Sequence, residues 1–145
     1  MDKNETLIGV CRFCGQYNLY SDMEGTSEAE RNERATRQCN CDEGKKYAEQ
    51  LAFEEKRKKQ REETLLRASI QIEELFGEGA RKQNFPSLSE NYLTIFNNMA
   101  ALIYDDVILK CNIDVTGLVK ATISTNAKGV LQIQRTDKIV GKLEV

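Results

Sequence analysis

The chain has 145 residues, 21 Lys and Arg against 23 Asp and Glu, a formal net charge of −2 and no His. This length allows one domain or two very small ones, and the near-balance of charge excludes a polybasic nucleic-acid coat protein and a long acidic tail. The absence of His excludes Ser-His-Asp and Cys-His catalysis, His-ligated metal sites and a His pH switch. The informative residue type is cysteine, with five copies.

The first 45 residues predict a compact, loop-rich module. Leu7 to Val10 is a short extended stretch, and Tyr17 and Leu19 alternate as the return strand of a hairpin. Ser27-Glu28-Ala29-Glu30 has the S-x-x-E pattern of a capping box, which predicts the start of a helix.

From the sequence we expect neither a signal peptide nor a membrane span. The apolar run near the N-terminus covers only four residues, which is too short for a signal peptide, and no stretch approaches the ~18 apolar residues that cross a bilayer. We therefore expect a cytoplasmic protein without a membrane partner. In a reducing cytosol, paired cysteines are more often metal ligands than disulfides.

Residues 46–84 predict one long charged helix and a linker. No Pro or Gly interrupts Lys45 to Phe76, and helix-forming residues dominate. Residues 54–63 are all polar or charged, whereas Leu65, Ala68, Ile72 and Leu75 follow at heptad-like spacing. We expect packed ends and a solvated middle. A homodimer through Leu65, Ile72, Leu75 and the following helix is one hypothesis for the packing.

Residues 85–145 predict a helix packed on an antiparallel sheet. Glu90 to Tyr104 is apolar over more than half of its circumference. After Asp105-Asp106 the apolar period changes to two, which predicts a meander of three or four strands, the last near residues 139–145. The expected fold class is α+β: a four-cysteine zinc-binding module over 1–45, a long charged helix and linker over 46–84, and a helix plus antiparallel sheet over 85–145.

Four of the five cysteines form two close pairs. Cys11 and Cys14 enclose two residues, Cys39 and Cys41 enclose one, and 24 residues separate the pairs. A C-x2-C pair directs two thiolates at one tetrahedral ion, and a helix start lowers the pKa of the second pair. Four thiolates without His favour structural Zn²⁺; an iron–sulfur cluster, a redox pair or ordinary thiols are the alternatives. The fifth cysteine, Cys111, is expected in the core of a strand.

The segment Cys11-Arg12-Phe13-Cys14-Gly15-Gln16 resembles the zinc knuckle of zinc-ribbon and treble-clef fingers. A knuckle, a hairpin and a ligand pair at a helix start is similar to the treble-clef order. The resemblance covers about the first 45 residues, and the single residue between Cys39 and Cys41 departs from the usual spacing. The whole layout also looks like small accessory proteins of bacteriophages and mobile elements, without a specific motif.

Two groups of basic residues are candidates for nucleic-acid contact. The first group is three arginines at every third position from Arg31 to Arg37, and the second is a basic run over residues 56–61 of the long helix. Acidic neighbours accompany both groups, so a solvated helix face is the competing interpretation. The candidates are Arg31, Arg34, Arg37, Lys56, Arg57, Lys58, Lys59 and Arg61.

No nucleophile–base pair, P-loop or dinucleotide motif is present, so we do not expect an enzyme. The sequence favours a zinc-stabilised protein that docks on a protein partner, as an accessory or inhibitory factor of a nucleic-acid machine. The alternative is a zinc-finger regulator that binds DNA or RNA directly.

Overall fold

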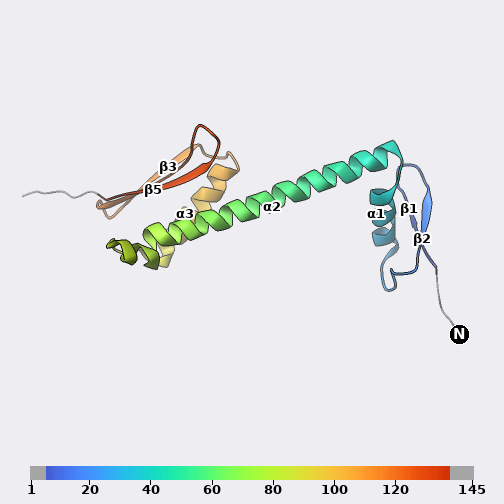
Figure 1. The fold of residues 1–145 in the computed structure, drawn as a ribbon, viewed down its shortest axis with the longest axis horizontal. Helices are drawn as coiled ribbons and strands as arrows, with labels where there is room; N and C mark the ends of the chain where they lie inside the picture. Colours follow the sequence, from blue (N-terminus) through green and yellow to red (C-terminus); the bar gives the residue numbers. More distant parts are fainter. Residues whose placement is uncertain (1–5, 138–145) are drawn as a thin grey trace, which may run out of the picture. The chain divides into compact units, whose positions relative to one another are not determined.

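The computed structural model describes residues 6–137, which form two compact units divided between Lys58 and Lys59. The division falls within helix α2 (Asp42–Phe76), so the long helix that the sequence predicted across Lys45 to Phe76 is shared between the units. The predicted α+β class is confirmed, since both units combine helices with antiparallel strands (Figure 1).

The first unit is a hairpin with a helix packed on it. Strands β1 (Leu7–Val10) and β2 (Tyr17–Tyr20) pair in antiparallel fashion, and helix α1 (Glu28–Gln38) contacts β1. The capping box is confirmed, because Ser27 Oγ accepts a hydrogen bond from the Glu30 amide at 3.2 Å. Gly9 allows the close approach, since a Cβ there would collide with the Arg31 carbonyl.

The apolar core of the first unit is very small. Between residues 6 and 58, the buried apolar side chains are Tyr20 and Ala35, together with Cys11 and Cys39. So few buried apolar side chains cannot offset the conformational entropy lost on ordering a unit of this length. The unit therefore needs a further source of stability, and its cysteines are the residues placed to supply one.

The second unit contains the C-terminal part of α2, a short 3-10 helix η1 (Glu78–Gln83), helix α3 (Glu90–Tyr104) and a three-stranded sheet. Strands β3 (Lys110–Val115), β4 (Val119–Thr125) and β5 (Leu131–Asp137) form an antiparallel meander with β4 in the centre. The predicted helix and these strands are confirmed. The fourth strand expected near residues 139–145 lies outside the described residues.

One apolar core joins the elements of the second unit. Its side chains come from α2, α3 and one face of the sheet, and Phe76 and Phe96 meet with ring centroids 4.7 Å apart. Alternate residues of β4 are buried, as the period of two predicted. The buried set is Ala68, Ile72, Phe76, Leu93, Phe96, Ala100, Ile103, Val115, Val119, Ala121 and Ile123.

The core already uses side chains that the homodimer hypothesis assigned to a second copy. Ile72 is fully buried, and Leu75 is partly buried against the same core. Dimerisation stays a prediction, and of the named residues Ile72 has no exposed surface to contribute to it. Cys111 is partly buried against this core, in agreement with a packing role.

Arg135 is a buried anchor that the sequence analysis did not identify. Its side chain is 3% exposed and its Nε donates to Asp137 Oδ1 at 2.8 Å. Its Nη1 donates to the Leu75 carbonyl at 2.6 Å and its Nη2 to the Pro86 carbonyl at 3.1 Å. One side chain thus joins the sheet to the end of α2, where helix carbonyls lack helical partners.

Among residues 6–137, no helix combines the length and apolar character needed to cross a membrane.

Candidate metal centre

The structure brings together the four cysteines that the spacing predicted. The Sγ atoms of Cys11, Cys14, Cys39 and Cys41 all lie within 4.8 Å of one another. The Sγ–Sγ distance is 3.8 Å between Cys11 and Cys41, and 3.3 Å between Cys14 and Cys39. These four residues can hold a metal ion. Each close pair takes one cysteine from the hairpin and one from the α1–α2 segment, so an ion here would join both parts of the unit.

The first pair lies in a tight turn between β1 and β2. The Cys11 amide donates to the Gln16 carbonyl at 2.8 Å, and the Gly15 amide donates to the Cys11 carbonyl at 2.9 Å. Gly15 has φ of 76°, which glycine adopts without the strain of a Cβ. These bonds close the knuckle expected from the C-x2-C spacing and direct both thiols to one side.

The second pair lies at the junction of α1 and α2. Cys39 follows the last residue of α1, and Cys41 directly precedes the first residue of α2. Cys41 Sγ accepts a hydrogen bond from the Gly44 amide at 3.2 Å, and its carbonyl accepts one from Lys45 at 2.9 Å. Cys41 therefore occupies the N-cap position, with sulfur in place of the usual side-chain oxygen. The helix dipole favours negative charge at this sulfur.

The four thiols differ in how readily they ionise. Burial raises the pKa of Cys11, but hydrogen bonds from the backbone of Cys14 and Phe13 and from nearby thiols outweigh it and lower this pKa to about 6. The Gly44 amide favours the Cys41 thiolate, but burial and the three neighbouring sulfurs outweigh it and raise that pKa to about 12. Four thiolates cannot gather here unless a cation balances their charge.

A layer of charged and aromatic side chains surrounds the knuckle. Glu33 accepts hydrogen bonds from Tyr47 Oη at 2.6 Å and from Arg37 Nε at 3.0 Å, and these lower its pKa. Arg12 lies 3.4 Å from Glu33 and stacks 4.5 Å from the centroid of the Tyr47 ring. The Phe13 ring meets the Tyr47 ring edge-on at 5.9 Å. This network ties the knuckle to α1 and to the start of α2.

The donor set and its spacing fit a single tetrahedral ion. A zinc–sulfur bond of about 2.3 Å places the sulfurs of a tetrahedral site about 3.8 Å apart. The sulfurs of Cys11 and Cys41 lie at this distance, and all four lie within 4.8 Å of one another. In an iron–sulfur cluster the cysteines bind different irons, so their Sγ atoms lie farther apart than around a single ion. The short Sγ–Sγ distances therefore favour a mononuclear site.

Comparison of the chain with family models, curated proteins and solved structures gives no match. The zinc-finger-like character of the N-terminal site rests on the clustering of the four cysteines.

The three arginines proposed for nucleic-acid contact are engaged within the first unit. Arg31 donates to the carbonyls of Ile8 and Thr26, at 3.1 and 2.7 Å. Arg34 binds both carboxylate oxygens of Asp22, at 3.0 and 3.1 Å. Arg37 binds Glu33 as described above. Each guanidinium thus supports the fold around the cysteine cluster.

The basic run in α2 is mostly exposed. Lys56, Arg57, Lys58 and Lys59 are all exposed, in agreement with the solvated middle expected from the sequence. Arg57 stacks 5.8 Å from the Phe53 ring. Arg61 differs, because it forms a two-point hydrogen bond with Asp105 at 2.9 and 2.8 Å. That bond also occupies one of the two acidic residues between α3 and the sheet.

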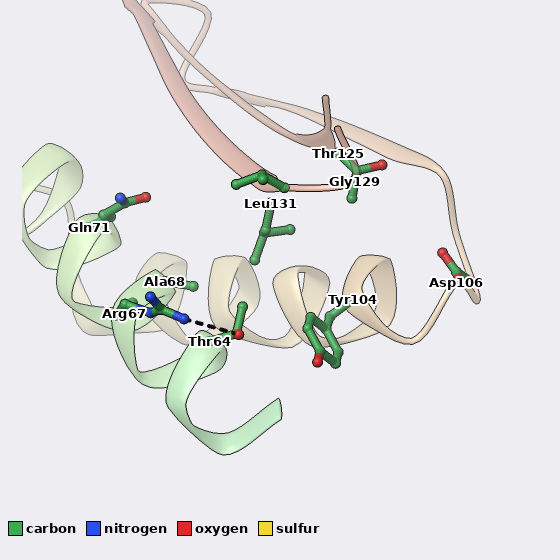
Figure 2. Close-up of a pocket in the computed structure, with 10 residues that line it drawn as sticks. Thr64, Arg67, Ala68, Gln71, Tyr104, Asp106, Thr125, Gly129 and Leu131 are labelled. Atoms are coloured by element: carbon green, nitrogen blue, oxygen red, sulfur yellow. Dashed lines mark hydrogen bonds between the residues drawn. The ribbon is translucent and has the colours of Figure 1, made fainter. Parts of the chain in front are cut away.

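The second unit has a separate pocket of about 590 Å³ (Figure 2). Figure 2 shows α2 contributing Arg67 and Gln71, the end of α3 contributing Tyr104, and the β4–β5 hairpin contributing Thr125. Arg67 Nη2 donates to Thr64 Oγ1 at 3.5 Å. Most of the polar groups lining this pocket belong to exposed side chains. The remaining lining residues are Ala68, Asp106, Gly129, Val130 and Leu131.

Gly44 offers a test of how tightly the second cysteine pair is held. A Cβ at this position would lie 3.0 Å from Cys41 Sγ, 3.1 Å from the Thr36 carbonyl oxygen and 3.2 Å from Cys39 Cβ. We expect Gly44→Ala to displace these groups and weaken metal affinity roughly tenfold, a magnitude typical of changes next to the ligands. Competition with a chromophoric chelator measures this affinity.

The matched control is Gly25→Ala. Gly25 has φ of 77° and no atom within 4 Å of a Cβ, so the substitution strains the backbone outside the cluster. Equal metal affinities for the two variants would show that Gly44 does not constrain the site.

Proposed function

We propose that this chain is a non-enzymatic, zinc-stabilised binding protein that docks on a protein partner. Its role would be that of an accessory or inhibitory factor of a nucleic-acid machine, of the kind that phages encode. The observation that carries the proposal is the cluster of four cysteine sulfurs within 4.8 Å in a unit with almost no apolar core. A closed all-thiolate site leaves no open position for substrate, so its role is structural.

Zinc is the ion that this proposal assigns to the site. Four thiolates and no imidazole suit zinc among the common protein metals, because soft sulfur ligands in tetrahedral geometry select it over magnesium, calcium and manganese. Cys11 and Cys14 would anchor the hairpin to the ion, while Cys39 and Cys41 would anchor the α1–α2 junction. The ion would supply the stability that this unit lacks.

Protein docking is favoured over direct nucleic-acid binding because three of the candidate basic residues already bind groups within the fold. Arg31, Arg34 and Arg37 bind groups of their own unit, and phosphate contact by them would first require breaking those bonds. The chain as a whole carries a net charge of −2. Such a charge gives little long-range attraction to a polyanion.

Affinity capture of the full chain from its native cell tests this proposal. The capture should be repeated after nuclease treatment, and the complex should then be rebuilt from purified components. We expect one protein component to remain bound after nuclease digestion and to form a defined complex with the zinc-loaded chain. A chain whose only partners disappear with the nucleic acid would contradict protein docking.

A second candidate function is direct binding of nucleic acid by the α2 run. It is favoured by the exposure of Lys56, Lys58 and Lys59. Phosphate contacts by such residues release counterions, so affinity would fall steeply with salt, with a logarithmic slope of about −0.7 to −0.9 for each contact. Because acidic residues accompany the run, we expect no measurable binding to duplex or single-stranded DNA at physiological salt.

Fluorescence anisotropy with labelled DNA and RNA measures that binding. The informative variant replaces Lys56, Lys58 and Lys59 with Gln and is compared with the wild-type chain. Tight, salt-sensitive binding that the triple variant abolishes would replace protein docking by the second candidate function.

A further inference from the structure

The hairpin of the first unit leaves one strand edge and one sheet face open beside the metal centre. Ile8 pairs with Leu19, and Val10 pairs with Tyr17. Directly opposite residues share a face of the sheet, as do residues two apart in a strand. These four side chains therefore form one surface, the hairpin face. They are exposed by 47%, 37%, 64% and 60% for Ile8, Val10, Tyr17 and Leu19.

The opposite face of the hairpin is used by the fold. Gly9 is buried so closely against α1 that a Cβ would collide with Arg31, and Tyr20 is 6% exposed. The two faces of the hairpin therefore differ in exposure. One side packs on α1, and the other presents two cross-strand apolar pairs to solvent.

The two edges of the hairpin also differ. On β1, side chains of α1 bind the outward backbone groups: Arg31 Nε donates to the Ile8 carbonyl at 3.1 Å, and Asn32 Oδ1 accepts from the Val10 amide at 2.8 Å. Thr36 Oγ1 continues the row, accepting from the amide of Arg12 at 3.2 Å. Helix α1 thus closes the β1 edge to any further strand.

The β2 edge has no such cover. The Cys11 amide donates to the Gln16 carbonyl across the turn, so the alternation of the ladder turns the backbone groups of Tyr17 and Leu19 outward. Within residues 6–137, no side chain and no backbone group outside the β1–β2 ladder bonds the backbone N–H or C=O of either residue. An unpaired edge of this kind is a template for another strand.

We propose that the β2 edge and the hairpin face bind an extended, uncharged segment of a partner protein, which adds to the sheet as a third strand. The proposal rests on the proposed docking function and names its surface. Main-chain bonds to Tyr17 and Leu19 supply the pairing, and alternate apolar side chains of the segment extend the hairpin face.

Charge and area favour this occupant over others. Neither strand of the hairpin contains a charged residue, although 30% of the chain is charged. A charged segment would therefore gain no ion pair from the strands. The exposed parts of the four side chains amount to roughly 400 Å², whereas each partner in a stable complex contributes about 800 Å². A second copy that used only the side chains of this face would fall short of a stable dimer, whereas a strand added along the β2 edge also gains main-chain hydrogen bonds.

Selection from a displayed library of random nine-residue peptides tests the proposal on the full, zinc-loaded chain. We expect enriched peptides with apolar residues at alternate positions and few charges. Their affinity should fall at least tenfold for Leu19→Lys, which places a charge on the hairpin face, and for Leu19→Pro, which removes an outward N–H. The matched control is Leu118→Lys, because Leu118 is 57% exposed in a turn of the second unit.

Metal content of each variant reports whether its first unit is folded, and Leu19→Lys keeps the test valid if Leu19→Pro does not fold. Failure to enrich any peptide, peptides without the alternating pattern, or equal affinity for Leu19→Lys and wild type would each overturn the proposal. Retained binding of the captured protein partner to Leu19→Lys would place docking elsewhere and leave the proposed function intact. Absence of any protein partner would instead remove the proposed function.

Discussion

Removal of the metal from the full chain will unfold residues 7–41 and leave the second unit folded. The reason is the difference between the two cores. Between residues 6 and 58, Tyr20 and Ala35 are the buried apolar side chains apart from cysteines, whereas eleven buried residues between 59 and 137 form the core of the second unit. Structural zinc contributes on the order of 10 kcal/mol to the folding of such modules. Amide exchange measured by NMR, before and after chelation, reports both units in one sample.

Cysteine variants separate loss of the ion from side effects of the chelator. Cys11→Ser removes a buried member of the cluster and should expose the amides of β1, β2 and α1 to exchange even with zinc present. Cys111→Ser is the matched control, because Cys111 packs on the other core and lies outside the cluster. Protected amides in β1 and α1 after complete metal removal would contradict a structural role for the ion.

Replacement of Arg135 by Met will destabilise the second unit by about 2–4 kcal/mol. The substitution leaves the carbonyl of Leu75 and the carboxylate of Asp137 without their donor. It also removes the guanidinium that stacks 5.6 Å from the ring centroid of Phe76 and 5.0 Å from that of Phe85. Exchange of the slowest β4 amides, which reports unfolding of the unit, measures this change.

Two further variants identify what Arg135 contributes. Arg135→Lys keeps the charge but loses the planar fork that reaches three acceptors, so an intermediate loss is expected. Arg67→Met is the matched control, since Arg67 is exposed and makes one hydrogen bond, to Thr64 at 3.5 Å. If Arg135→Met costs no more than Arg67→Met, the buried anchor does not stabilise the unit.

The cysteine cluster could be predicted because the short spacing within each cysteine pair is typical of metal ligands. Cys11-x2-Cys14 defines a knuckle by itself, and the acidic residues after Cys41 indicate a helix start. The helices and the meander followed from apolar periods of 3.6 and two, which each element carries within its own residues. The capping box at Ser27 is local in the same sense.

Features that depend on distant partners could not be read from the sequence. Arg135 meets Leu75 across 60 residues and Pro86 across 49, and no local pattern distinguishes it from a surface arginine. Tyr47 lies in the charged helix but bonds Glu33 of the preceding helix. The short helix η1 was missed because its residues lie in the segment read as a linker, and Gly77 ends α2 with a bond back to Glu73.

The open β2 edge is also a tertiary property. Alternation of Tyr17 and Leu19 indicated a strand, but their exposure depends on which face α1 covers. The edge of β1 is closed by Arg31 and Asn32, two residues of α1 whose roles no spacing rule assigns.

Metal analysis of the reduced full chain tests the central claim most directly. We expect a single zinc ion per chain, lost in Cys11→Ser and retained in Cys111→Ser. We also expect cobalt substitution to give the intense absorption of a tetrahedral cobalt–thiolate site. A chain that folds its first unit without any metal, or that holds two or more irons, would contradict the account.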